Sequence, residues 1–179
     1  YLTNVDYIDP IDDCGKPDDV CMQFGMGAQF VIDRKMGRKI NIDEAMAILE
    51  KTEEAGLVHA TMNRQEIDFL CNCCSCHCMI LKTALAQHRP GIALNSGFMP
   101  EWDADSCTSC KTCIDRCPTD ALVLGEEDVP EVNLDRCIGC GVCATGCPSE
   151  AIGLAERPGV PVPPVDQKAL SEAIKASQA

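Results

Sequence analysis

The sequence predicts an α+β fold in which a domain of two pseudo-symmetric halves follows an α-rich domain that also carries cysteines. The pattern C-x2-C-x2-C-x3-C-P occurs twice, within DSCTSCKTCIDRCPTDALVL and DRCIGCGVCATGCPSEAIGL. The stretch between the copies, VLGEEDVPEVNL, is typical of two short strands around an acidic turn. Upstream of the copies, apolar residues follow helical spacing. The predicted domains are residues 1–94 and 101–154, with a linker at 95–100 and a tail at 155–179.

The clearest element of the N-terminal domain is a helix with the sequence NIDEAMAILEKTEEAG. Asn41 is placed to cap its first turn, and Glu44, three residues later, completes a capping box. Gly56 is the residue type that commonly ends a helix. A second helix is predicted for MILKTALAQH, and a third, interrupted by glycines, within residues 18–38.

The segments outside the two domains are rich in proline and small residues. NSGFMP, at residues 95–100, has the composition of a linker. The tail contains RPGVPVPPV, whose prolines favour an extended chain. A short polar helix is predicted to follow, from Asp166 to Ala176.

Fifteen cysteines in 179 residues are the strongest compositional signal, because aromatic residues make up only 4% of the chain. Disulfides, zinc and iron–sulfur clusters each explain such a content. Disulfides are disfavoured as the main use, because no apolar signal-like run opens the sequence and the odd count leaves one thiol over. The spacing of the cysteines has to decide between the two kinds of metal site.

The chain is acidic, with a formal net charge of −13 at pH 7. A surface of this charge repels phosphate backbones and anionic headgroups, so neither nucleic acid nor a membrane surface is expected as a partner. No stretch approaches the roughly 20 apolar residues that a membrane span needs. We therefore expect a cytoplasmic protein.

The spacing of the repeated cysteines favours iron–sulfur clusters over zinc. Three cysteines two residues apart let one short loop bind three corners of a cubic cluster. Pro118 and Pro148 fix φ after the fourth cysteine and turn the chain away, so the last corner of each cube needs a ligand from elsewhere. Zinc sites usually set two close pairs far apart and often include histidine, which neither copy contains.

Residues 105–154 resemble bacterial two-cluster ferredoxins, in which the fourth cysteine of each such run ligates the other cluster. The resemblance implies a ferredoxin-like βαββαβ domain with two [4Fe–4S] clusters. Neither half completes its own site, which explains the duplication. The implied ligands of cluster one are Cys107, Cys110, Cys113 and Cys147, and those of cluster two are Cys137, Cys140, Cys143 and Cys117.

The two cysteine loops differ in composition, and this difference predicts unequal reduction potentials. The protein sets each potential through hydrogen bonds to sulfur, local charge and solvent access. The second loop is small and uncharged, whereas the first carries Lys111, Asp115 and Arg116. The order of the potentials stays open at this point, because cations and additional N–H bonds both raise a potential.

Seven further cysteines lie upstream of the repeat, five of them within CNCCSCHC. Thiols at a surface are difficult to keep reduced, so this density favours a metal. Four of the seven can complete a third [4Fe–4S] cluster, while zinc and redox-active thiols are the alternatives. His77 lies inside the run and is either a ligand or a solvated loop residue. The candidate ligands are Cys14, Cys21, Cys71, Cys73, Cys74, Cys76 and Cys78.

The first hundred residues resemble a family of anaerobic iron–sulfur proteins in which a cysteine-rich domain precedes a dicluster ferredoxin. The resemblance is carried by CxxPxxxC from Cys14, GRKINIDEA from Gly37, EEAGLVH from Glu53 and CNCCSCHC from Cys71. Within that family, the plan is similar to the small electron-transfer subunits of tungsten-containing class II benzoyl-coenzyme A reductases. This resemblance implies a tungstopterin catalytic partner and an upstream electron donor.

The chain shows no nucleotide-binding loop, no nucleophile with its base and no other cofactor fingerprint. We therefore expect no catalysis by the chain alone, but an electron-transfer subunit that relays single electrons through about three clusters to a catalytic partner. One alternative is an electron-entry subunit of a hydrogenase, aldehyde oxidoreductase or heterodisulfide reductase complex. Others are a redox-sensing regulator and a scaffold whose N-terminal metal is zinc.

Overall fold

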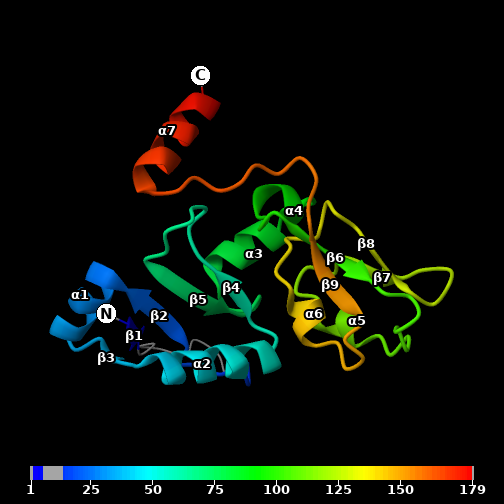
Figure 1. Cartoon of the computed structure of the whole chain (residues 1–179), viewed down its shortest axis with the longest axis horizontal. Helices are drawn as coiled ribbons and strands as arrows, with labels where there is room; N and C mark the ends of the chain where they lie inside the picture. Colours follow the sequence, from blue (N-terminus) through cyan, green and yellow to red (C-terminus); the bar gives the residue numbers. More distant parts are fainter. Residues whose placement is uncertain (1, 6–13, 179) are drawn as a thin grey trace. The chain divides into compact units, whose positions relative to one another are not determined.

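The computed structural model describes residues 2–5 and 14–178 of the chain, and these residues form two compact units (Figure 1). The first unit comprises the described parts of Tyr1–Glu50, His59–Asn72 and Pro161–Ala179. The second unit comprises Lys51–Val58 and Cys73–Val160. This division differs from the predicted boundary at residue 94, because the segment that follows Cys73 packs with the repeated cysteine loops.

A five-stranded sheet in the N-terminal region corrects the prediction that residues 1–94 are α-rich (Figure 1). The strand order is β3-β1-β2-β5-β4, with β1 antiparallel to β2 and β3, and β2 antiparallel to β5. Each strand is too short to show the alternation that identifies a strand in a sequence. The strands are β1 (Leu2–Val5), β2 (Cys21–Phe24), β3 (Gly37–Lys39), β4 (Val58–Ala60) and β5 (Phe69–Cys73).

Helix α2 (Ile42–Glu54) confirms the strongest helix prediction. The Glu44 backbone N–H donates to Asn41 Oδ1 at 2.9 Å, and the Asn41 N–H donates to Glu44 Oε2 at 2.9 Å, which is the predicted capping box. Gly56 follows the helix with a φ of 71°, and its N–H donates to the Glu53 carbonyl at 2.9 Å. Helix α1 (Gly25–Asp33) runs through the glycines that the sequence suggested as interruptions.

The core of the first unit lies between α2 and one face of the sheet. The register places Met22 opposite Leu70 and Leu2 opposite Phe24, so these four side chains share a face. They pack with Ile40 and with three residues of α2: Ala45, Ile48 and Leu49.

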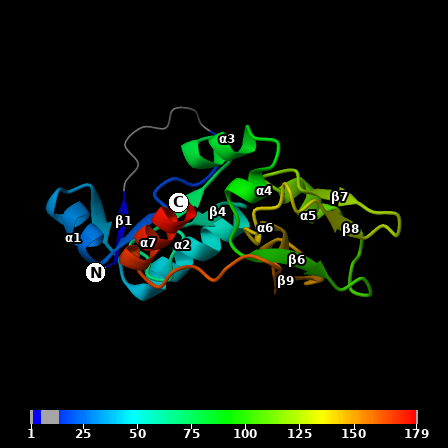
Figure 2. The same ribbon diagram turned by 90° about the horizontal axis from the view of Figure 1, so that it is seen from above.

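Helix α1 packs against the other face of the same sheet. Gln23, which neighbours Met22 in β2, points away from α2, and its Oε1 lies 2.9 Å from the position that a Cβ at Gly27 of α1 would take. In Figure 2, α1 lies beside β1, in agreement with this contact. The sheet is therefore covered on both faces near β1 and β2.

The tail is attached to the loop between β4 and β5 within the first unit. Gln65 Nε2 donates to the Pro163 carbonyl at 2.9 Å, and the Gln65 backbone N–H donates to the Pro164 carbonyl at 2.9 Å. Helix α7 (Gln167–Ser177) follows, and Asp166 Oδ1 caps it by accepting from the Ala169 N–H at 2.8 Å.

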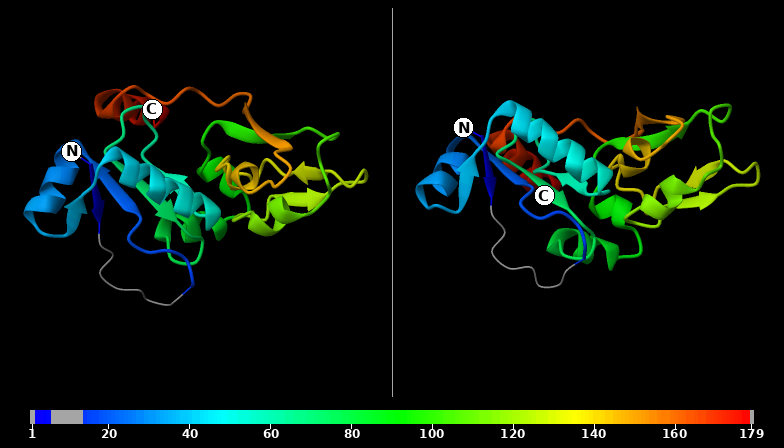
Figure 3. Two further views of the ribbon diagram at one scale, coloured as in Figure 1. Left: turned by 60° about the horizontal axis from the view of Figure 1, so that its bottom comes forward. Right: turned by 90° about the horizontal axis from the view of Figure 1, so that it is seen from below.

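The second unit contains the elements β6, α5, β7, β8, α6 and β9 in chain order, preceded by two short helices (Figure 3). β6 pairs with β9 and β7 pairs with β8, both antiparallel. The β7–β8 pair confirms the two predicted strands around the acidic turn. The bounds are α3 (Met79–Leu85), α4 (Pro90–Ala93), β6 (Phe98–Trp102), α5 (Thr112–Arg116), β7 (Leu122–Leu124), β8 (Pro130–Val132), α6 (Val142–Thr145) and β9 (Ile152–Glu156).

Two further features of the described residues bear on the sequence-based expectations. Residues 95–100, predicted as a linker, belong to the second unit: β6 begins at Phe98, and the Ser96 N–H donates to the Ile138 carbonyl at 3.0 Å. Within residues 2–5 and 14–178, the longest helix has 13 residues, whereas a membrane-spanning helix needs about 20.

Candidate metal centres

The two cysteine loops of the second unit repeat the same backbone conformation at matching positions. Ser109 and Lys111 have φ values of 55° and 63°, and their counterparts Gly139 and Gly141 have φ values of 70° and 79°. Left-handed residues on either side of the middle cysteine reverse the chain locally. Each short loop can therefore turn three successive cysteines toward one pocket.

Hydrogen bonds repeat between the two halves as well. The Asp120 N–H donates to the Cys117 carbonyl at 3.4 Å, and the Glu150 N–H donates to the Cys147 carbonyl at 3.2 Å. Thr119 and Ser149 each place a hydroxyl oxygen 3.6 Å from the sulfur of the preceding cysteine, Cys117 and Cys147. The duplication in sequence is thus a duplication in structure.

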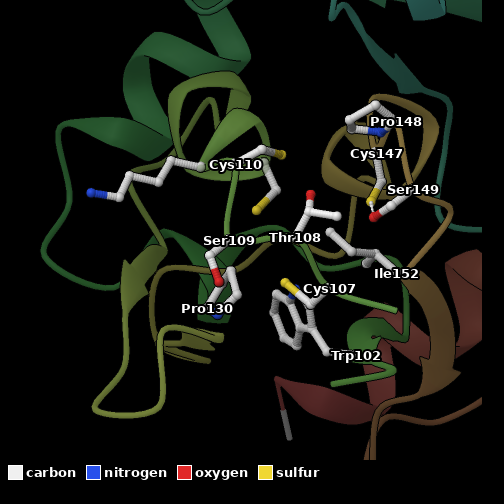
Figure 4. Close-up of a pocket in the computed structure, with 12 residues that line it drawn as sticks. Trp102, Cys107, Thr108, Ser109, Cys110, Pro130, Cys147, Pro148, Ser149 and Ile152 are labelled. Carbon is white, nitrogen blue, oxygen red and sulfur yellow. Dashed lines mark hydrogen bonds between the residues drawn. The ribbon is translucent and has the colours of Figure 1, made fainter. Parts of the chain in front are cut away.

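Each pocket is lined by one triplet of cysteines and by the fourth cysteine of the other copy. Figure 4 shows Cys107 against the ring of Trp102, with Cys110 and Cys147 on other sides of the same pocket. The first pocket is lined by Cys107, Cys110, Cys113 and Cys147, and the second by Cys117, Cys137, Cys140 and Cys143. These are the two groups of four that the sequence predicts, while their role as cluster ligands stays a prediction.

The thiols of the second pocket are largely buried, and burial raises their pKa values. The pKa rises to about 11 for Cys140 and to about 12 for Cys143, and charge repulsion from Cys117 adds to the burial in both. Burial followed by repulsion from Cys117 also raises the pKa of Cys137. Cys117 therefore acts electrostatically as a member of this pocket.

The first pocket is more open to solvent. Cys110 is exposed, and a hydrogen bond with the Thr112 hydroxyl at 3.4 Å lowers the pKa of its thiol. Burial raises the pKa of Cys113, with a further contribution from Cys147. For Cys147 itself burial acts to raise the pKa, but hydrogen bonds from Ser149 outweigh it and the pKa is lowered. The two pockets thus contain the same number of thiols but differ in their exposure to solvent.

The predicted linker and one distant arginine hold the loop of the second pocket. Ser96 Oγ donates to the Gly139 carbonyl at 2.6 Å. Arg157 Nη1 donates to the Cys137 carbonyl at 2.9 Å, and its Nη2 donates to the Leu134 carbonyl at 2.8 Å. These bonds fix the backbone beside Cys137.

Arg116 connects the end of α2 with α6. Its guanidinium donates to the carbonyls of Glu53 at 2.6 Å, Glu54 at 3.1 Å and Val142 at 3.4 Å. A Cβ at Gly146 would lie 2.0 Å from Arg116 Nε, so a larger residue there would displace this guanidinium. The contacts of Arg116, Arg157 and Ser96 could not be predicted from the sequence, because their partners are backbone carbonyls far away in the chain.

The seven upstream cysteines fall into two groups. Cys14, Cys21 and Cys71 belong to the first unit, and Cys14 is exposed. Cys21 and Cys71 are partly buried, and a hydrogen bond between their side chains, together with burial, raises the pKa of Cys21. The second unit contains the other four: Cys73, Cys74, Cys76 and Cys78.

Three donors of the CNCCSCHC run converge in the loop before α3. His77 Nδ1 lies 3.3 Å from Cys74 Sγ and 3.5 Å from Cys76 Sγ. The ligand atoms of these three residues all lie within 4.8 Å of one another. The structure therefore favours His77 as a donor over a solvated loop residue.

Two clusters of apolar side chains place these groups of cysteines next to one another in space. Cys113 and Cys143 belong to one buried cluster, against which Cys117 and Cys147 pack. A second cluster is formed by Val58, Leu81, Ile138 and Val142, and partly buried side chains packed on it include Cys73, Cys78 and Cys140. The second pocket thus adjoins the first pocket on one side and the CNCCSCHC run on the other.

Comparison with protein families identifies a 4Fe-4S dicluster domain at residues 106–151. The matched segment contains all eight cysteines of the repeat and supports a ferredoxin-type domain. The chain matches no curated protein.

The residues of both pockets fit [4Fe–4S] clusters. Each pocket offers four thiols, the donor set that such clusters require. The Ala121 N–H also donates to Cys117 Sγ at 3.3 Å, a hydrogen bond of the kind that tunes a ligating sulfur.

Different solvation of the pockets predicts the order of the two reduction potentials. Reduction adds negative charge, which burial disfavours, so the centre in the second pocket should have the lower potential. We expect an anaerobic redox titration monitored by electron paramagnetic resonance to resolve two couples, since about 59 mV already corresponds to a tenfold difference in a one-electron equilibrium. Lys111→Gln, which removes an exposed cation from the first loop, should lower only the upper couple. Coincident couples, or a shift of the lower couple, would contradict the assignment.

Proposed function

We propose that the chain is an iron–sulfur electron-transfer subunit with about three [4Fe–4S] clusters. The main support is the arrangement in the second unit, where Cys140 of the second pocket shares an apolar cluster with Cys73 and Cys78. A third centre in the CNCCSCHC run would adjoin the second pocket, which itself adjoins the first. Such clusters, when bound, accept and release single electrons, so three in a row form a relay.

Exposure along the row is consistent with a relay. Cys110 in the first pocket and Cys76 in the upstream run are exposed, whereas Cys137 and Cys143 between them are buried. Accessible ends allow a donor and an acceptor to approach, and a buried middle excludes water from the intervening centre. We assign the two ends to electron entry and exit without fixing the direction.

We propose that the two dicluster sites exchange their fourth ligands. Cys147 completes the site of the first triplet and Cys117 that of the second, as the lining of the pockets and the repulsion between their thiols support. The third cluster takes four ligands from the seven upstream cysteines. Cys74 and Cys76 are its best-supported members.

Zinc is the second candidate for the upstream site, and the close spacing of its donors favours it. Two ligands of one zinc ion stand at most about 4.6 Å apart, because each Zn–S bond is about 2.3 Å long. His77 Nδ1 lies 3.3 Å from Cys74 Sγ and 3.5 Å from Cys76 Sγ, both within that separation. In a cubic cluster, each cysteine binds a different iron, so its ligands are more widely separated.

Metal analysis of anaerobically purified protein distinguishes these possibilities. Three clusters give about 12 iron and 12 acid-labile sulfide per chain, whereas two clusters and one zinc ion give about 8 iron and 1 zinc. Cys74→Ser should lower the metal of the upstream site alone, leaving about 8 iron. Ser75→Ala, which removes only a hydroxyl from the same run, should retain all metal. A protein free of iron would refute the electron-transfer proposal.

For the partner we propose a tungstopterin subunit of the benzoyl-coenzyme A reductase type, supplied by an upstream electron donor. The sequence motifs of the first hundred residues support this choice. Anaerobic purification from the native source should bring down a tungsten enzyme that accepts electrons from the chain. A hydrogenase, aldehyde oxidoreductase or heterodisulfide reductase in its place would favour the related electron-entry role, and a regulatory target would favour a redox sensor.

A further inference from the structure

Cys21 and Cys71 lie beside the last pair of the β2–β5 ladder, on neighbouring antiparallel strands of the first unit. The register of β2 and β5 pairs Met22 with Leu70 and Gln23 with Phe69. The next residues along the same register are Cys21 and Cys71, the neighbours of the Met22–Leu70 pair. Directly opposite residues of an antiparallel pair point to the same face of the sheet.

The hydrogen bonding of the ladder identifies the type of pair that the two cysteines occupy. The Phe24 N–H donates to the Asp68 carbonyl at 2.7 Å, so Phe24 and Asp68 form a hydrogen-bonded pair. Pair types alternate along a ladder, so extending this register by one pair assigns Cys21 and Cys71 to a non-hydrogen-bonded position. In such pairs the Cα atoms approach to about 4.5 Å, inside the range of about 4.4–6.8 Å that a disulfide spans.

The side chains and the neighbouring backbone agree with this placement. The two thiols form a hydrogen bond with each other. Beside them, the buried side chain of Asn72 donates through Nδ2 to the Val20 carbonyl at 2.5 Å, and its Oδ1 lies 2.6 Å from His59 Nδ1. Asn72 therefore fixes the end of β2 against β5 at the position of the two cysteines.

We propose that Cys21 and Cys71 form a reversible cross-strand disulfide and do not ligate the upstream metal centre. Both side chains are partly exposed, so a small oxidant can reach them. In the cytoplasm such bonds are usually transient and redox-dependent. The pair would thus be a thiol-based redox site separate from the proposed relay.

The proposed oxidant is a small-molecule disulfide. One thiolate attacks it and forms a mixed disulfide, with release of one small thiol. The second cysteine then attacks the mixed disulfide, which forms the Cys21–Cys71 bond and releases the second small thiol. The two protons of the cysteines end on the two small thiols, and the two electrons reduce the oxidant. A dithiol reductant reverses the sequence.

Peptide mapping of the full-length, anaerobically purified protein tests the proposal. The protein is treated with oxidised glutathione, quenched in acid, alkylated and digested without reduction. We expect a linked pair of peptides containing Cys21 and Cys71, cleaved by dithiothreitol, with the iron content unchanged from the untreated sample. Absence of this linkage while other thiols become modified would overturn the proposal, and this readout requires no variant.

Single substitutions separate the disulfide from metal ligation. Cys21→Ser and Cys71→Ser should each abolish the linked peptides and leave a glutathione adduct on the remaining cysteine, with full iron and zinc content. Cys14→Ser is the matched control from the same unit and should retain the linkage. Loss of metal in Cys21→Ser or Cys71→Ser, with folding retained by circular dichroism, would show a ligand and refute the proposal. The iron of the dicluster domain would be unaffected by that outcome, so the electron-transfer function is tested separately.

Discussion

Replacing Cys117 with serine should remove the metal centre of the second pocket and spare the one built on its own triplet. Cys117 follows Cys113 in the sequence, yet it lines the pocket of Cys137, Cys140 and Cys143. Its charge raises the pKa values of those three thiols. Since a hydroxyl is a far weaker iron ligand than a thiolate, we expect the loss of about 4 iron per chain.

Double substitutions identify which centre is lost, because two changes at one site are not additive. Cys117→Ser combined with Cys140→Ser should contain as much iron as Cys117→Ser alone. Combined with Cys110→Ser, it should lose the iron of both pockets. Cys147→Ser is the reciprocal control and should show the reverse pattern. Additive loss with Cys140→Ser would contradict the exchange of ligands between the copies.

Gly139→Ala should destabilise the second unit strongly. Gly139 has a φ of 70°, and an added Cβ would lie 2.3 Å from the Phe98 carbonyl oxygen and 2.5 Å from Ser96 Oγ. Phe98 cannot move away easily, because it is paired with Glu156 in the β6–β9 ladder. The left-handed conformation costs alanine about 1–2 kcal/mol, and displacement of Ser96 costs about 1 kcal/mol more for its hydrogen bond.

These two costs sum to about 2–3 kcal/mol, and the clash with the Phe98 carbonyl adds to them. We therefore expect a loss of about 3 kcal/mol or more, which lowers the unfolding midpoint by roughly 6–12 °C in a protein of this size. This shift of the midpoint is measured by thermal unfolding of the anaerobic protein, followed by the visible absorption of the clusters. Gly159 has a φ of 78°, and a Cβ added there would meet open space. Gly159→Ala should therefore show the conformational cost alone. Gly153→Ala, in open space with an ordinary φ, should be nearly neutral. Equal effects at residues 139 and 159 would rule out the predicted clash.

Local signals predicted those parts of the fold whose causes are local in sequence. The capping box of Asn41 and Glu44 depends on residues three apart, and the structure contains both of its hydrogen bonds. The β7–β8 pair likewise surrounds a short acidic turn. The grouping of the dicluster cysteines was implied by the resemblance to two-cluster ferredoxins, which is carried by the spacing of the repeat.

Features that depend on residues far apart in the chain could not be predicted from the sequence. The sheet of the first unit pairs strands far apart in the chain, such as β2 with β5, and its strands are too short for a clear pattern. Ser109 and Lys111 adopt left-handed conformations where the second copy has glycine, so only comparison of the copies reveals their role. Arg157 bonds to carbonyls, and every residue type has a carbonyl.

The proposed exchange of ligands between the copies constrains when a nascent chain can bind its clusters. While only the first copy has left the ribosome, its three-cysteine loop lacks Cys147 as a fourth ligand. Cys117 at that stage lacks the three cysteines of the second copy. Iron delivered at that stage would be held incompletely and returned to solution. Maturation of both centres should therefore start only after translation has passed residue 147, and a chain truncated between the copies should emerge with neither.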